Sequence, residues 1–312
     1  DFFFDTGPSF FSGLNPHVPA KVANPLRAIL DAIDEPLACQ PYESFGLKFP
    51  EGDFLHTTDF GQAGGVLDQV SGSAATRQWQ QLMQSMKPLE QAVAALPTAA
   101  LRADIGALWT AGPFLPNFAK TNPLENLKLT QPFTKIVQKA GVTDPFARNW
   151  IDLLCFCLSG LPADGTITAE MAMMMGEFYE PGATMDCPIG GAKAIVDALV
   201  RGIEKNGGSV FCQSHVERIV INNGRATGVQ LKKNGQYIQA KKGVVSNLSV
   251  WDLMKSGIVD TQQFPSDFVQ ERESTPVGKS FMHLHIGFEA TRVELEKLQA
   301  HYMYMDDWKQ RY

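Results

Sequence analysis

The 312-residue sequence lacks the short motifs that mark the common nucleotide-binding and catalytic sites. It contains no GxGxxG, no GxSxG and no HExxH, which excludes a dinucleotide fingerprint, a nucleophile elbow and a zincin-type metal site. Gly278-Lys279-Ser280 resembles the end of a phosphate loop, but Glu273 stands where such a loop needs glycine. If the protein is an enzyme, a cofactor therefore carries its chemistry, and the sequence assigns no catalytic residue.

Cysteine is scarce and is not arranged for metal binding. The five cysteines form no CxxC pair, and Cys155-Phe156-Cys157 is spaced too closely for a usual zinc half-site. We expect buried free thiols in a reducing compartment. His283 and His285 share one face of a predicted strand, but no third ligand is recognisable beside them. The sequence therefore predicts structural histidines and no metal site.

Charge and long apolar runs are also limited. Charged residues make up 19% and the net charge is −6, which argues against a nucleic-acid partner and gives no polybasic patch for a membrane surface. The sequence has no run of about 18 uncharged apolar residues, so no spanning helix is predicted. The chain begins at Asp1 without methionine and ends at Tyr312. We interpret it as an internal fragment, from which any targeting segment would be missing.

The sequence contains enough apolar residues, 44%, for a folded protein with two domains. Apolar periodicity and capping residues predict helices over about 24–33, 73–95, 98–109, 134–140, 143–159, 169–179, 192–206, 250–255 and 293–299. Alternation predicts strands at 2–5, 209–213, 244–247, 281–288 and 302–305, with further strands around Asn-Gly turns at 222–224 and 234–235.

Two of the predicted helices could contact an apolar ligand. The helix over 145–159 is apolar nearly all round. The helix over 169–179, for which Thr168 is the expected cap, carries four methionines. A methionine stripe at helical spacing belongs to a core more often than to a pocket, so both interpretations stay open.

Pro188-Ile189-Gly190-Gly191 opens the stretch around which the chain is organised. A helix follows whose predicted apolar stripe consists of Ile195, Val196, Leu199, Val200 and Ile203. Several strands then come in quick succession. This order indicates part of a nucleotide-binding α/β fold that has no phosphate loop of its own.

These segments resemble those of phytoene-desaturase-type flavoproteins, in particular the carotenoid isomerases of plants, algae and cyanobacteria (prolycopene isomerase-like proteins). The resemblance rests on islands that run from end to end of the chain. They are Phe4-Asp5-Thr6-Gly7-Pro8-Ser9 with Ser12-Gly13, Pro50–Leu55, Asp144–Leu154, Pro188–Gly191 with Val196–Gly202, Ser214–Glu217, Val244–Asn247 and Ser280–Phe288.

The resemblance implies an α/β fold in which a Rossmann-like, glutathione-reductase-type FAD-binding domain is interleaved with a substrate domain of helices and mixed sheet. Residues 1–13 would end the first FAD-binding segment, and 14–180 would form a mostly helical substrate segment. Residues 181–250 would form the second FAD-binding segment, and 251–312 the second substrate segment. The N-terminal GxGxxG unit of the family is absent from this chain.

The resemblance also implies a noncovalent FAD site. The positions it assigns to the flavin ring or pyrophosphate are Gly7, Pro8 and Ser9. Gly190 and Gly191 would let the backbone pass close to the cofactor. Val216 would pair with the adenine through its backbone.

The family acts on long polyene hydrocarbons, so the resemblance implies a FAD-dependent carotenoid cis–trans isomerase that converts poly-cis lycopene to the all-trans form. A carotenoid desaturase or a retinol-saturase-like oxidoreductase is the nearest alternative. A non-catalytic isoprenoid-binding protein of the same superfamily is the alternative of another class. Carotenoid as the partner molecule, a plastid location and peripheral membrane contact are further expectations.

Overall fold

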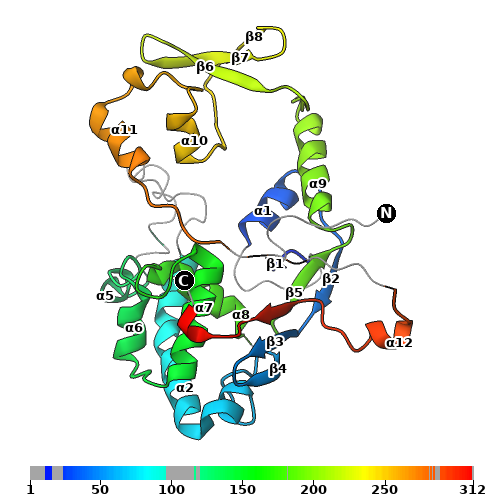
Figure 1. Cartoon of the computed structure of the whole chain (residues 1–312), viewed down its shortest axis with the longest axis vertical. Coiled ribbons are helices and arrows are strands. Elements are labelled where there is room, and N and C mark those ends of the chain that lie inside the picture. The colour runs from blue at the N-terminus through cyan, green and yellow to red at the C-terminus, as the bar shows by residue number, and fades with distance from the viewer. Residues whose placement is uncertain are drawn as a thin grey trace. The chain divides into compact units, whose positions relative to one another are not determined.

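The computed structural model describes residues 11–15, 24–95, 116, 120–180, 182–280, 282, 284 and 289–310. The chain divides into two compact units (Figure 1). The larger unit comprises residues 1–206 and 279–312, and the smaller unit comprises residues 207–278. The segment boundaries expected from the resemblance, after residues 13, 180 and 250, stay a prediction.

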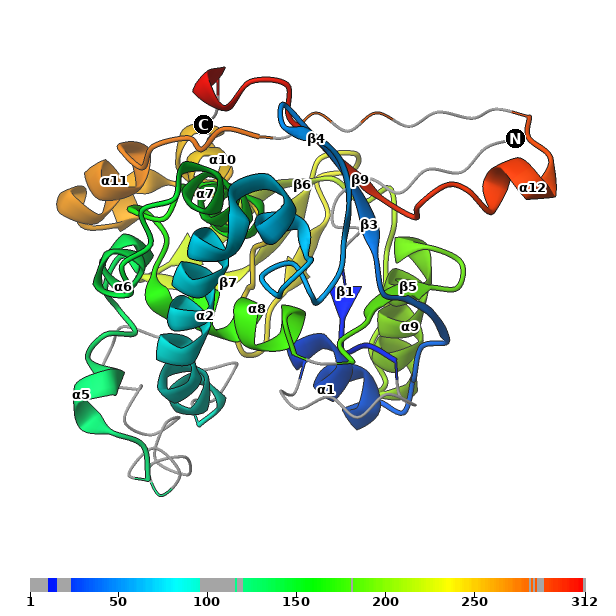
Figure 2. The ribbon, with the colours of Figure 1, turned by 90° about the horizontal axis from the view of Figure 1, so that it is seen from below.

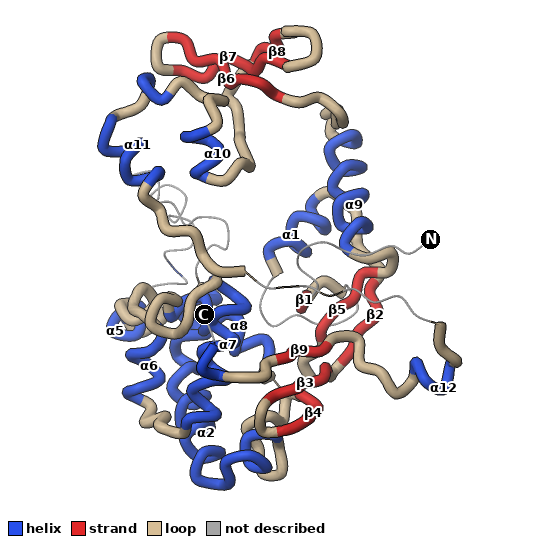
Figure 3. Tube along the Cα trace, in the orientation of Figure 1, coloured by secondary structure: helices blue, strands red, loops and turns tan. Residues whose placement is uncertain are grey.

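The described elements form a mixed α/β structure (Figure 3). The helices of the larger unit are α1 (Pro25–Ala32), α2 (Val66–Ala94), α5 (Pro123–Asn126), α6 (Phe133–Lys139), α7 (Pro145–Ser159), α8 (Thr168–Phe178), α9 (Ala192–Lys205), α12 (Arg292–Leu295) and the 3₁₀ helix η3 (Trp308–Gln310). Its strands are β1 (Phe11–Ser12), β2 (Cys39–Tyr42), β3 (Phe45–Phe49), β4 (Gly52–His56), β5 (Met185–Pro188) and β9 (Tyr302–Tyr304). The smaller unit contains β6 (Val216–Asn222), β7 (Arg225–Leu231), β8 (Tyr237–Gln239), α10 (Val250–Lys255), α11 (Ser266–Glu273) and the 3₁₀ helix η2 (Thr261–Gln263).

Helices begin and end at the residues whose chemistry predicts it. The Asp144 carboxylate accepts a hydrogen bond of 2.8 Å from Ala147 N at the start of α7, and Pro145 occupies the first helical position. The helix ends at Gly160, which has a left-handed φ of 74°. The predicted helix over 73–95 is the main part of α2, which starts earlier and kinks at Gly72, where φ is 76°.

The expected cap of α8 is wrong. Thr168 is the first residue of the helix, and Ile167 precedes it without a side-chain cap. The Thr168 hydroxyl donates to Gln131 O at 2.9 Å instead. The hydroxyl that the sequence pattern predicts as a helix cap therefore bonds to the segment before α6 instead.

Two sheets of the larger unit bring together segments that are far apart in the sequence. Strand β5 lies between β1 and β2, antiparallel to both. Strand β3 lies between β4 and β9, and β9 is parallel to β3 although about 250 residues separate them. Figure 2 shows β3, β4 and β9 beside one another, with α2 and α8 as neighbours on one side. The pairing of β3 with β9 could not be read from local pattern.

The main core is formed by α2, α6, α7, α8 and the β3–β4 hairpin. An aromatic cluster fills its centre. The ring of Phe60 stacks on Trp150 with centroids 5.0 Å apart and meets Trp79 edge-on at 5.2 Å. Because α7 packs here on most of its sides, its nearly continuous apolar surface is explained by burial.

A second core lies between α1, α9 and the segments beside β1 and β2. Its buried members are Leu14, Leu30, Leu37, Ile195 and Ala198. Of the predicted stripe on α9, Val196 and Ile203 are exposed, because Ala198 and Gly202 provide the close-packing face.

The smaller unit is a three-stranded antiparallel sheet with two short helices. Asn223 and Gly224 both have positive φ, 50° and 71°, as the predicted hairpin turn requires. The predicted strands at 209–213 and 244–247 are wrong, since no described strand pairs with either segment. Phe211 is 75% exposed and Val245 is 99% exposed. Without a partner strand, an alternating apolar segment has nothing to stabilise its extended form.

Several predicted elements lie partly or wholly outside the described residues. These are the strand at 2–5, the helix at 98–109 and most of the strand at 281–288, including His283 and His285. Met282 and Leu284 are described, and they are exposed and outside any strand.

Replacing Gly61 by alanine should destabilise the larger unit. A Cβ at Gly61 would overlap the indole ring of Trp79, which is only 2% exposed and fixed in the aromatic cluster. We expect a loss of about 1–3 kcal/mol in the free energy of unfolding, measured by urea denaturation with tryptophan fluorescence. Gly243→Ala is the control, because a Cβ there meets no atom within 4 Å. Equal stability of the two variants would contradict the packing described.

Candidate functional site

The turn between β5 and α9 is the candidate site. Ile189 N donates to Ala38 O and Gly191 N donates to Pro188 O, both at 2.9 Å. Gly190 and Gly191 have φ values of 95° and 71°, a region that favours glycine. Helix α9 starts directly after Gly191, and no side chain caps it.

This geometry suits a negatively charged group. The first turn of a helix presents backbone N–H groups, and its dipole favours negative charge there. With glycine at the preceding positions, no Cβ blocks the approach of a ligand to the backbone. The turn could therefore hold the phosphate part of a cofactor.

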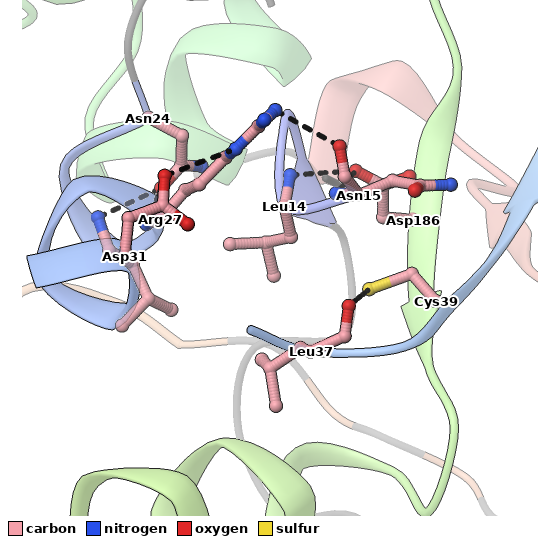
Figure 4. A network of polar contacts seen from close by, with 9 residues as sticks. Leu14, Asn15, Asn24, Arg27, Asp31, Leu37, Cys39 and Asp186 are labelled. Atoms are coloured by element: carbon pink, nitrogen blue, oxygen red, sulfur yellow. Dashed lines mark hydrogen bonds and ion pairs between the residues drawn. The ribbon is translucent and has the colours of Figure 1, made fainter. Parts of the chain in front are cut away.

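A buried carboxylate connects this turn to the segment after β1 (Figure 4). Asp186 lies in the central strand β5 and is 1% exposed. Its Oδ2 accepts hydrogen bonds from Leu14 N at 2.8 Å and from Asn15 N at 3.1 Å. Its Oδ1 is buried and has no hydrogen-bond partner among the residues that the structure describes. Two charge-assisted bonds thus fix residues 14 and 15 against β5.

Further polar contacts hold the same segment from the other side. Arg27 Nη1 donates to Asn15 O at 3.0 Å and its Nε lies 3.6 Å from Asp31 Oδ2. Asn24 caps α1 and donates from Nδ2 to Ser12 O at 2.6 Å. The start of α1 and strand β5 therefore both position residues 12–15.

The larger unit also contains a small cavity of about 20 Å³, room for a single water. Ser12, Glu43, His56, Thr58, Glu177, Phe178, Ala183, Thr184 and Met185 line it. His56 Nε2 is 3.3 Å from Tyr179 Oη, and this hydroxyl accepts from Trp150 Nε1 at 2.8 Å. Burial lowers the pKa of His56 to about 3, so the ring is neutral at physiological pH. Burial also raises the pKa of the Tyr179 hydroxyl.

The thiols are free, as predicted, but they are mostly not buried. Only Cys155 is fully buried, Cys39 is half-buried, and Cys157, Cys187 and Cys212 are exposed. Burial, with the nearby Asp186 carboxylate, raises the pKa of Cys39 to about 11, so it is not poised as a nucleophile.

Neither metal binding nor membrane spanning finds support in the described part of the chain. No group of three or more metal-ligating side chains occurs among those residues. No helix among them is long and apolar enough to cross a bilayer.

The six predicted cofactor residues fall in three places. Gly190 and Gly191 form the turn before α9 in the larger unit. Val216 begins β6 of the smaller unit, opposite Leu231 and next to a β-bulge. Gly7, Pro8 and Ser9 lie outside the described residues. Their roles in cofactor binding stay predictions.

Sequence reasoning missed two residues of this region. Asp186 had a detectable signal, because an acidic residue inside the short strand Met185–Pro188 requires a partner. Glu177 had none, because its partner Ser12 is 165 residues away.

Comparisons with known proteins confirm the resemblance to prolycopene isomerases. The chain is 26% identical over 172 residues to a chloroplastic prolycopene isomerase of Daucus carota. This match covers 55% of this chain and 27% of that protein. It is 31% identical over 110 residues to a Danio rerio protein named inactive all-trans-retinol 13,14-reductase, covering 35% of this chain and 18% of that protein. The chain thus spans less than a third of each of these relatives. No protein-family model matches it.

Among solved structures, an oxidoreductase of Methanosarcina mazei has a similar fold. The TM-score is 0.52 at 16% identity, and the match covers 85% of this chain and 51% of that one. The fold of the chain is therefore a mixed α/β arrangement shared with a protein of that class.

Asp186→Ala should destabilise the larger unit strongly. The change leaves two buried N–H donors, those of Leu14 and Asn15, without an acceptor. Each unsatisfied donor costs about 1–3 kcal/mol, so we expect a total loss of about 2–5 kcal/mol in urea denaturation. Cys187→Ala is the matched control, since this neighbouring side chain is exposed. A loss no greater than that of the control would contradict the anchoring role.

His56 should make stability depend on pH on the acid side. Its pKa in the folded protein is about 3, below the ordinary value of 6.5, so the unfolded chain binds the proton more readily. The stabilisation is complete above about pH 6.5 and is lost as the pH falls toward 3, by at most about 1.4 kcal/mol per pH unit.

His56→Phe removes the titrating group and keeps an aromatic ring among Phe45, Phe60 and Trp150. We expect the free energy of unfolding of the wild type, measured by urea denaturation at several pH values, to fall relative to that of the variant as the pH decreases from 6.5. A constant difference across that range would contradict the assignment of a neutral, buried His56.

Proposed function

We propose that this protein is a FAD-dependent carotenoid cis–trans isomerase that converts poly-cis lycopene to the all-trans form. The observation that carries the proposal is the sequence similarity to plant prolycopene isomerases over 55% of the chain. The likeness of fold to an oxidoreductase structure is consistent with it.

The residues of the β5–α9 turn fit a phosphate-bearing cofactor. Gly190, Gly191 and the uncapped start of α9 would hold the diphosphate of FAD in a Rossmann-like domain of this kind. Val216 would contact the adenine, and Gly7, Pro8 and Ser9 would lie near the flavin or pyrophosphate. When bound, the flavin supplies the electron exchange that weakens a polyene double bond.

The protein's own contribution is an uncharged interior around this chemistry. His56 is neutral, Tyr179 keeps its proton, and α8 places Met171 and Met175 in the core. Met173 and Met174 of the same helix are half-buried. A hydrocarbon polyene binds favourably where no charge must be desolvated and where flexible methionine side chains adapt to its shape. A plastid location, as in the relatives named chloroplastic, and peripheral contact with a membrane complete the proposal.

The second candidate is an oxidoreductase that desaturates or saturates such double bonds. The similarity to the retinol reductase-like protein of Danio rerio favours it. Product mass separates the two, since isomerisation leaves the mass unchanged and redox chemistry changes it by two hydrogens.

The full-length protein should convert poly-cis lycopene under reducing conditions with FAD. We expect all-trans lycopene of unchanged mass, separated by chromatography, at least about tenfold above a heat-inactivated control. Product lacking or gaining two hydrogens would support the second candidate. Unchanged isomer ratios and mass would rule out both.

A further inference from the structure

Residues 120–140 differ in charge from the protein as a whole. The segment contains four lysines and a single carboxylate, Glu125, whereas the chain carries a net charge of −6. It forms α5 and α6, which lie beside α2 in the larger unit (Figures 1 and 2). The lysines are Lys120, Lys128, Lys135 and Lys139. They are spread along the sequence, so the overall charge predicts no basic patch, but the fold brings Lys128 and Lys139 to one groove.

Two leucines at α5 face solvent. Leu124 is 70% exposed and Leu127 is 68% exposed. Leu127 keeps a helical backbone, so the two side chains are neighbours three residues apart on one helical turn. The next leucine, Leu129, is only 4% exposed and belongs to the main core. Single exposed leucines are ordinary, but an adjacent pair beside a groove indicates an interaction surface.

Polar contacts hold α5 in this position. Asn122 Oδ1 accepts a hydrogen bond of 3.0 Å from Leu124 N, and a proline occupies the first helical position. Glu125 forms an ion pair with Lys128, which neutralises the carboxylate of the segment. Lys135 and Lys139 are exposed, and no carboxylate pairs with either of them among the described residues. The segment therefore presents positive charge beside the leucines.

The groove between α2, α5 and α6 adds apolar surface to this region. Its volume is about 420 Å³. Leu89 and Ile136 line it and are 1% and 6% exposed, so its inner wall is apolar, and two of the lysines line it as well. Glu90, a carboxylate of α2, does not line it and packs against Gly176 of α8 instead. Apolar walls beside cations suit an amphiphile whose polar end is an anion.

We propose that the α5–α6 surface, formed by Leu124, Leu127 and the four lysines, binds an anionic lipid bilayer. The inference rests on the proposed function, because a polyene hydrocarbon partitions into a bilayer and its enzyme must meet it there. The leucines enter the interface between headgroups and acyl chains, and the lysines approach the headgroup phosphates. Leucines alone would suit any apolar partner, whereas the surrounding positive charge makes an anionic lipid surface the complementary one.

Helix α12 provides a matched control. Leu295 and Leu298 are also three residues apart, and they are 52% and 45% exposed. Their neighbours include Glu294 and Glu296, which an anionic surface would repel. Figures 1 and 2 both show α12 and α5 on opposite sides of the larger unit. Replacing the two leucines of α12 removes similar apolar area from a surface that has no role in the proposal.

The first test is sedimentation of the full-length protein with phosphatidylcholine vesicles that contain about 30% phosphatidylglycerol. We expect Leu124→Ser with Leu127→Ser to weaken binding about tenfold, since less apolar area enters the interface. Leu295→Ser with Leu298→Ser should stay within about twofold of wild type. Circular dichroism checks that both variants are folded. Absence of wild-type binding, or equal loss in both variants, would overturn the proposal.

The second test changes the charge. Lys135→Gln with Lys139→Gln should weaken binding to the same vesicles about tenfold and reduce its salt dependence. Lys297→Gln with Lys309→Gln is the control, because it changes the net charge equally at exposed positions outside this surface. If the control loses as much affinity, binding follows net charge alone and the α5–α6 surface is ruled out.

A second copy of the chain is the main other occupant. Light scattering of the full-length protein without lipid detects it. We expect Leu124→Ser with Leu127→Ser to leave the molecular mass unchanged. A wild-type oligomer that this variant converts to monomers would show that the leucines join copies of the chain, which contradicts the proposal.

Vesicle binding requires no turnover, so it can fail separately from the proposed function. If binding depends on the α5–α6 surface but poly-cis lycopene is changed in neither isomer ratio nor mass, the proposed function fails and the surface stands. If lycopene in vesicles is isomerised while the Leu124→Ser, Leu127→Ser variant binds as wild type does, the proposed function stands and the surface is wrong.

Discussion

The larger unit depends on one buried carboxylate. Asp186 joins a strand near the middle of the chain to backbone amides 172 and 171 residues before it. A buried carboxylate is costly unless its oxygens accept strong hydrogen bonds, so its position dictates where residues 14 and 15 must lie. That constraint places β1 against β5, and β5 leads straight into the Gly190–Gly191 turn. The geometry of the candidate cofactor turn and the position of Ser12 therefore share one origin.

The same constraint connects the turn to the cavity. Ser12 pairs with Met185 in the sheet, one residue from Asp186, and its hydroxyl reaches Glu177 on α8. The sheet thus fixes a hydrogen bond between a serine of strand β1 and an acid of helix α8. Backbone pairing holds Ser12 in place, so its hydroxyl links the sheet to the end of α8.

Local chemistry made the helices predictable from the sequence, whereas the pairing between distant segments could not be predicted. Asn24 and Asp144 each precede a proline, and both cap helices that begin where the sequence predicts. Thr168 has the same chemistry, but a tertiary acceptor takes its hydroxyl. The segments at 209–213 and 244–247 alternate like strands, yet a strand forms only where another strand pairs with it. The family resemblance could be recognised from the sequence because each matching segment is a short local stretch. The contact of Glu177 could not be predicted, since its partner Ser12 lies 165 residues away in the sequence.

The charges of the larger unit follow a pattern that bears on the proposed substrate. The largely buried Glu35 carboxylate is paired with Arg201 and Lys205, whose side chains are about half exposed. In the interior, His56 is neutral and the Tyr179 hydroxyl holds its proton, while burial favours the neutral forms of Glu177 and Cys155. Such an interior presents hydrogen-bonding groups without net charge. A polyene offers no hydrogen bonds and no charge, so it gains nothing from ionised side chains and would require their desolvation.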